Sequence, residues 1–232
     1  MVYCGYGVYD VVGEVVADFE YLSLVFTRLG PDLVRLVARV GNGEVPLGLL
    51  NVPAGRFVEV LPHPPVGGGV RVDYLMVRLA EEVSILPGES AVLDQQVPVD
   101  LVVRVGGVPL RVVPVKAKYA LYGPPDLGIL CRYSSTTLIQ GLPECLRARV
   151  RVRISNSDRE VVRMSRVVIP VGSLGLYLPP TKQPVTSSVR VVVHGPTYAE
   201  VTTELMPSAD VGDGVRPVVE PSTSTFIMRF GL

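Results

Sequence analysis

Arg147-Ala-Arg-Val-Arg-Val-Arg-Ile154 alternates an arginine with an apolar residue at every step. Side chains of a β-strand point alternately to the two faces of a sheet, so this stretch predicts a strand with one apolar and one cationic face. We expect the apolar face to pack into a core. The arginines of the cationic face are Arg147, Arg149, Arg151 and Arg153.

The segments around this strand carry further signals of β-structure. The run from Glu160 to Pro170 follows a polar turn at Ser155 to Asp158, and we expect it to pair with the arginine-rich strand as a hairpin. Turn signals such as Gly41-Asn-Gly43 and Gly106-Gly107 recur at a spacing typical of antiparallel sheets. Valine, the dominant residue, favours strands. The sequence therefore predicts an all-β protein with an antiparallel β-sandwich architecture.

Residues 33–40 fit two interpretations, because their apolar side chains match both a helical spacing and a strand alternation. Arg35 and Arg39 fall on the polar face of the strand interpretation, and turn residues flank the segment on both sides. These features favour a hairpin strand over a short helix. Either element is compatible with the same fold class.

A division of the chain is expected near residue 80. Residues 1–80 would form an N-terminal β subdomain, and residues 81–232 a C-terminal immunoglobulin-like β-sandwich. The segments Val83 to Ser90 and Val97 to Val105 resemble the opening strands of such a sandwich. No linker of disordered composition separates the halves, so they could instead share one continuous core.

Composition limits the location and the partners of the chain. Its 22 basic and 22 acidic residues cancel, which disfavours nucleic acid as a partner. Every apolar stretch is interrupted before it could cross a bilayer, and the N-terminal region lacks a signal-peptide pattern. We therefore expect a cytoplasmic protein without a membrane span. Scarce Asn and Gln together with 21 prolines are typical of a thermophile.

The metal-ligating residue types are few and widely spaced. Cys4, Cys131 and Cys145 form no C-x-x-C pair, and neither His63 nor His194 has a second ligand at the usual spacing. We expect buried free thiols and no metal or cofactor. A disulfide bond between Cys131 and Cys145 remains an open alternative.

Three stretches together resemble a known family. They are Tyr74 to Gly88, Lys118 to Ser134, and Arg151 to Ser157 with the strand that follows. The chain is similar over nearly its whole length to the archaeal family catalogued as domain of unknown function number 432. This resemblance implies an archaeal, intracellular, mainly β protein. It supplies no catalytic residue, because the family has no assigned activity.

The segment from Lys116 to Tyr133 concentrates aromatic and cationic side chains around a turn at residues 123–126. Tyrosines beside cations can stack on a sugar or a base, or anchor a protein interface. They can equally close the edge of a sandwich, which is the interpretation we favour. The candidate binding residues here are Lys118, Tyr119, Tyr122, Arg132 and Tyr133.

The four alternating arginines are the second candidate site. A strand rise of about 3.3 Å per residue places neighbouring guanidinium groups about 7 Å apart, which suits a repeating anionic ligand. Exposed strand faces are, however, often charged and balanced by acids on neighbouring strands. The neutral chain favours this second interpretation.

No catalytic motif stands out, and the G-x-S-x-G pattern of serine nucleophiles is absent. We predict a non-enzymatic β-sandwich that acts as a binding or assembly module, through an unknown protein partner or through self-association. The run Ser222 to Phe230 is a candidate edge strand for self-association. One alternative is an enzyme whose carboxylates or histidines converge from distant strands. The other is an anion or nucleic-acid binder that uses the arginine face.

Overall fold

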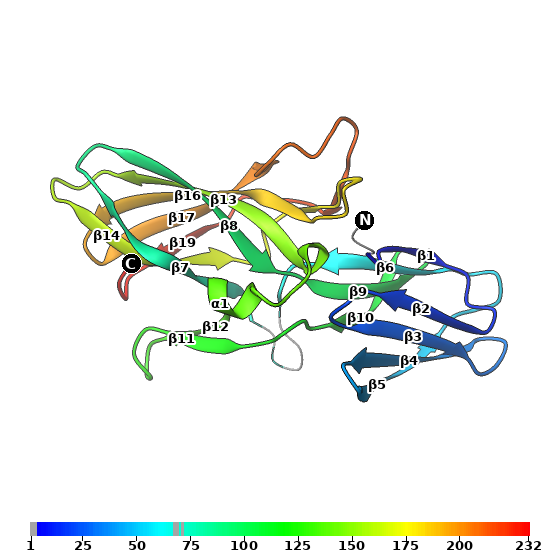
Figure 1. Ribbon diagram of the computed structural model, residues 1–232. Helices are drawn as coiled ribbons and strands as arrows, with labels where there is room; N and C mark the ends of the chain where they lie inside the picture. The colour runs from blue at the N-terminus through cyan, green and yellow to red at the C-terminus, as the bar shows by residue number, and fades with distance from the viewer. Residues whose placement is uncertain (1–3, 67–69, 71) are drawn as a thin grey trace.

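The computed structural model describes residues 4–66, 70 and 72–232. The chain is 58% strand and 3% helix, and its sheets pack against one another without forming a barrel. Figure 1 shows four sheets arranged as two sandwiches. These features confirm the prediction of an all-β protein with antiparallel sheets packed as sandwiches. Among the described residues, no helix is long and apolar enough to cross a membrane.

The first sandwich consists of sheets A and B, on the right of Figure 1. Sheet A contains β1 (Gly7–Tyr9), β6 (Val58–His63), β9 (Asp100–Val105) and β10 (Val108–Val113). Sheet B contains β2 (Glu14–Asp18), β3 (Ser23–Arg28), β4 (Leu33–Val40) and β5 (Gly43–Asn51). Fully buried side chains from both sheets, including Phe26, Leu36 and Leu101, form its core.

Residues 33–40 form a strand that pairs with β3 and β5, as the flanking turns indicated.

The second sandwich consists of sheets C and D. Sheet C contains β11 (Tyr119–Tyr122), β12 (Ile129–Ser135), β7 (Tyr74–Ile85) and β14 (Val162–Pro170). Sheet D contains β18 (Pro217–Val219), β15 (Leu176–Tyr177), β16 (Val185–Gly195), β13 (Arg147–Asn156), β8 (Ser90–Pro98), β17 (Tyr198–Pro207) and β19 (Thr225–Met228). The pairs β12–β7 and β13–β16 are parallel, and the other described pairs are antiparallel. Buried side chains of both sheets form a second core.

The arginine-rich segment forms β13, and its burial alternates as predicted, with Ala148, Val150, Val152 and Ile154 buried. The predicted hairpin with the following strand is wrong. β13 pairs with β8 and β16 in sheet D, whereas β14 pairs with β7 in sheet C.

The buried amide of Asn156 explains why the chain changes sheets after β13. Its Nδ2 atom donates to the carbonyl oxygens of Ile85 (3.0 Å) and Glu160 (2.8 Å). Its Oδ1 atom accepts from the backbone N–H of Asp158 at 2.9 Å. These three bonds hold the connection between the two sheets, where a hairpin would have kept both strands in one sheet.

The chain passes between the sandwiches more than once. β8 ends at Pro98 in sheet D, and β9 begins at Asp100 in sheet A. After β12, the helical turns α1 (Thr136–Ile139) and η1 (Glu144–Leu146) return to the first core. The division of the chain near residue 80 stays a prediction. The first core itself is built from segments on both sides of that point.

A buried ion pair joins the two sandwiches. Arg132 of β12 and Asp100 of β9 both have fully buried side chains, and Arg132 Nη2 lies 3.0 Å from Asp100 Oδ1. The backbone of Val115 completes the contact, because its N–H donates to the same carboxylate oxygen and its carbonyl accepts from Arg132. Sheets A and C are therefore held together by charged hydrogen bonds as well as by apolar packing.

Candidate functional site

A cavity lies where the chain returns from the first sandwich to the second. Its volume is about 760 Å³. Its walls come from β7, β12, α1 and the segment 116–118 that leads from β10 towards β11. We call it the main cavity. Its lining residues are Arg78, Leu79, Ala80, Lys116, Ala117, Lys118, Tyr133, Ser135, Thr136, Thr137 and Leu138.

The main cavity is strongly cationic. Arg78, Lys116 and Lys118 all line it, and no carboxylate stands among its described lining residues. None of these three side chains takes part in an ion pair between described residues. Hydroxyl groups of Tyr133, Ser135, Thr136 and Thr137 add hydrogen-bond donors. This combination of positive charge and donors suits an anionic ligand.

Lys116 is held in a strained backbone conformation at the edge of the main cavity. Its φ of 43° lies in the left-handed region, which costs a non-glycine residue about 1–2 kcal/mol. Its ammonium nitrogen lies 3.4 Å from the carbonyl oxygen of Leu138 and 5.2 Å from the ring centre of Tyr21. Such backbone strain is often found at functional positions. Here the strained residue also carries an ammonium group that is held in place by these two contacts.

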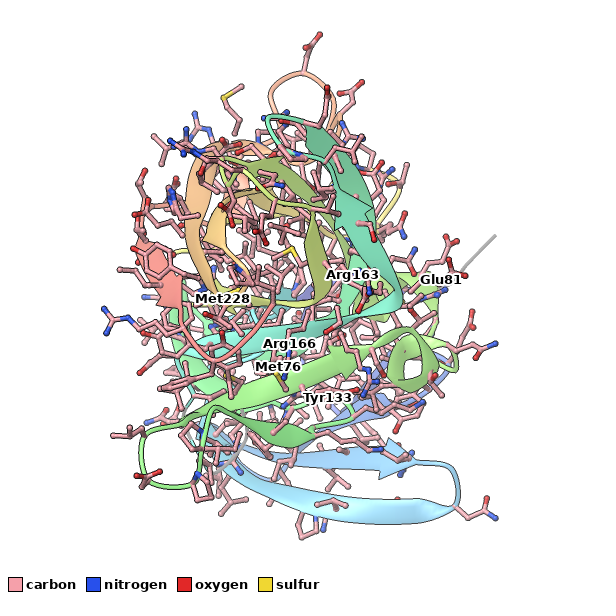
Figure 2. The ribbon with its side chains drawn as sticks, turned by 90° about the vertical axis from the view of Figure 1, so that its left-hand side faces the viewer. Met76, Glu81, Tyr133, Arg163, Arg166 and Met228 are labelled. Carbon is pink, nitrogen blue, oxygen red and sulfur yellow. The ribbon has the colours of Figure 1, made fainter. Side chains whose placement is uncertain are left out.

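A smaller cavity of about 170 Å³ shares Arg78 and Tyr133 with the main cavity. Its other lining residues are Met76, Ser165 and Arg166. Figure 2 shows Met76, Tyr133 and Arg166 close together. The two cavities therefore meet at shared side chains on sheet C.

The structure separates the five candidate residues of the segment Lys116 to Tyr133. Lys118 is exposed and Tyr133 half-buried, and both line the main cavity. Arg132 is fully buried in its ion pair, and the half-buried Tyr119 has its ring centre 5.9 Å from the Arg132 guanidinium carbon. Tyr122 is 1% exposed, and its hydroxyl donates to Gly231 O at 2.9 Å. Two of the five thus face a cavity. Tyr122 packs within the second sandwich, and Arg132, with Tyr119 beside it, lies at the junction of the two sandwiches.

Sequence reasoning missed the remaining cations of the two cavities. Lys116 lies only two positions from Lys118, but no pattern in the sequence distinguishes it. Arg78 and Arg166 come from different strands, and only the pairing of β7 with β14 brings them together. In the sequence, Arg78 and Arg166 each interrupt a largely apolar run, and this interruption is the feature that could have indicated a functional role.

None of the four arginines of β13 lines either cavity, and three of them have polar partners on β8 or β17. Arg147 donates to Gln96 at 3.0 Å, Arg151 makes two bonds to Asp94 at 2.7 and 3.0 Å, and Arg153 lies 3.2 Å from Glu204. The hydrogen bond from Arg151 lowers the pKa of Asp94. The exposed Arg149 lines a shallow cavity of about 260 Å³ beside that same pair. The positive charge of this face is therefore largely balanced by nearby polar and acidic side chains.

The histidines lie in different sandwiches. His63 ends β6, and His194 lies near the end of β16. His194 Nδ1 lies 3.0 Å from Ser157 Oγ, and its Nε2 lies 3.9 Å from Glu200. The Ser157 hydroxyl also donates to the Val193 carbonyl at 2.6 Å, which competes with donation to the imidazole. Ser157, His194 and Glu200 lie on the surface, so their arrangement gives little support to the enzyme alternative.

Among the described residues, no three His, Cys, Asp or Glu side chains gather to hold a metal.

All three cysteines are buried free thiols. Cys131 lies in the core of the second sandwich and Cys145 in that of the first, so no bridge joins them. Burial raises the pKa of Cys131 to about 12. The Cys4 and Cys145 thiols are hydrogen-bonded to each other, and this bond together with burial raises the pKa of Cys4.

The comparisons with known proteins agree with the family resemblance. The family model described as "Protein of unknown function (DUF432)" matches residues 5–229 of the chain. A search of the curated proteins and a search of the solved structures each give no match. Because the family model covers nearly all of the 232 residues, the chain belongs to the DUF432 family.

Proposed function

We propose that this protein is a binding module for a small anionic molecule, which it takes up in the main cavity. The observation that carries the proposal is the presence of three cations, without a carboxylate among the described lining residues, around a space of about 760 Å³. Cavities of this size hold small molecules, and they often lie where two packed units of a protein meet.

The lining favours a ligand with a phosphate group and an apolar part. Arginine and lysine beside several hydroxyl groups can satisfy the many acceptor sites of a phosphate. Leu79, Ala80, Ala117 and Leu138 offer apolar surface beside these polar groups. Such a surface would contact the organic portion of the ligand.

The same lining favours binding over catalysis. Carboxylates and histidines are frequent general bases, and the described lining contains neither. The proposal therefore keeps the protein in the class of non-enzymatic binding modules and names an anion as its partner.

Isothermal titration calorimetry with inorganic phosphate, pyrophosphate and citrate at about 0.05 M salt tests the proposal. We expect at least one of these anions to bind, and its affinity to fall as salt is raised. Lys118→Gln should weaken binding about fivefold to tenfold, because it removes one exposed cation of the cavity.

Arg35→Gln is the matched control, since it removes one positive charge from the exposed face of β4 in sheet B. It should leave the affinity within twofold of the wild type. Failure of all three anions to bind would contradict the proposal, and so would an equal loss in the two variants.

A further inference from the structure

Arg78 and Arg166 lie directly opposite each other on neighbouring strands. The antiparallel register of β14 and β7 pairs Arg166 with Arg78. Like charges at such positions repel and destabilise a sheet. Both side chains line the smaller cavity. The sheet therefore holds two cations around one small space.

This repulsion is not offset by a close ion pair between described residues. Neither arginine takes part in an ion pair between described residues. The Nε atom of Arg166 is buried without a hydrogen-bond partner. A buried donor of this kind costs free energy unless some other group accepts its hydrogen.

The pairing of β14 with β7 is irregular next to Arg166. Between Arg78 and Val83, β7 has four residues, Leu79 to Glu82, whereas β14 has only Ser165 between Met164 and Arg166. The Ser165 hydroxyl donates to a main-chain oxygen of Leu232 at 3.0 Å, which ties this part of β14 to Leu232. Irregularities in strand pairing often lie beside functional sites.

We infer that the ligand carries two anionic groups, one in the main cavity and one between Arg78 and Arg166. This inference rests on the proposed function, because it places a second subsite beside the first. The shared residues Arg78 and Tyr133 connect the two spaces, so one molecule can extend from one to the other.

The chemistry of the smaller cavity favours a phosphoryl group over a carboxylate. One guanidinium fork satisfies the two oxygens of a planar carboxylate. A terminal phosphoryl group offers three oxygens in a tetrahedral arrangement, so it can accept from two guanidinium groups at once. The ligand class is therefore a diphosphate ester or a molecule that is phosphorylated at two positions.

Calorimetric titration of the full chain with inorganic phosphate and with pyrophosphate tests the inference. The wild type should bind pyrophosphate at least about tenfold more tightly than phosphate, because only pyrophosphate fills both subsites. Arg166→Gln should remove most of this preference and leave the phosphate affinity within about twofold.

Arg163→Gln is the matched control, because Arg163 lies on the same strand and outside both cavities. Its guanidinium lies 3.9 Å from the Glu82 carboxylate, and Figure 2 shows it apart from Arg166. This variant should keep the preference for pyrophosphate.

Thermal unfolding without ligand gives a second readout. At low salt Arg166→Gln should unfold about 1–3 °C above the wild type, because it removes one of two facing like charges. Unchanged pyrophosphate preference in Arg166→Gln would overturn the inference and leave the proposed function standing. Equal binding of phosphate and pyrophosphate by the wild type would also overturn it. Failure of both anions and of citrate to bind would instead contradict the proposed function.

Discussion

His63 shows how one side chain can make the protein sensitive to acid. It lies at the end of β6, half-buried, and its Nδ1 atom is 2.8 Å from the carbonyl oxygen of Pro64. Burial lowers its pKa below 6.5, and the nearby charge of Arg104 acts in the same direction. The sequence placed this histidine beside prolines, but it could not show that sheet A would partly bury the ring.

Acidification should therefore destabilise the protein through His63. The unfolded chain has a histidine pKa near 6.5 and the folded chain a lower one, so the unfolded state binds more protons below pH 6.5. The stabilisation is complete above pH 6.5 and is lost as the pH falls towards the folded pKa. Urea midpoints at pH 7, 6 and 5 should fall for the wild type and fall less for His63→Gln. An identical decline in both proteins would contradict this assignment.

β13 marks the limit of what a local pattern can predict about an element. Strict alternation correctly predicted the strand and its two faces, because both follow from the direction of successive side chains. It could not predict the partners of the strand, because pairing depends on contacts far along the chain. The polar turn at residues 155–158 looked like a hairpin signal, and the buried amide of Asn156 instead directs the chain to sheet C.

Asn156→Ala should destabilise the protein by about 2–4 kcal/mol, since it leaves the buried carbonyl oxygen of Ile85 and the partly buried one of Glu160 without their donor. Equilibrium unfolding in urea measures the change. Asn51→Ala, at an exposed position of β5, is the control and should stay within about 0.5 kcal/mol of the wild type. A similar small change for Asn156→Ala would show that packing alone sets the connection between the sheets.

At the scale of the whole molecule, the candidate site is assembled from segments that the sequence keeps apart. Lys118 and Tyr133 were predictable because aromatic and cationic residues concentrate between residues 116 and 133. Arg78 and Arg166 join them only because β7 lies between β12 and β14 in sheet C. The order of strands in a sheet is a property of the complete fold, and no single segment encodes it.

The buried pair of Arg132 and Asp100 should be among the contacts that couple the two sandwiches most strongly. Arg132→Met leaves a buried carboxylate without its charged partner, which should cost about 3–5 kcal/mol in chemical denaturation. The double variant Arg132→Met with Asp100→Asn should recover part of this loss. Arg153→Gln, which breaks an exposed pair, should cost less than about 1 kcal/mol. If Arg132→Met lost no more stability than Arg153→Gln, apolar contacts would dominate the junction between the sandwiches.

Because the chain returns to its first sandwich, that sandwich can be completed only after a long stretch of later sequence has been synthesised. β6 is complete at His63, but its neighbour β9 starts at Asp100, and the last core residue of that sandwich is Leu146. At about 5–20 residues per second, a ribosome needs roughly 4 to 17 seconds to make this interval. Among the nascent N-terminal strands, the β6 edge stays unpaired until β9 is made, and the apolar face stays unfinished until the end of this interval. Binding by a chaperone would protect these strands until the missing residues emerge.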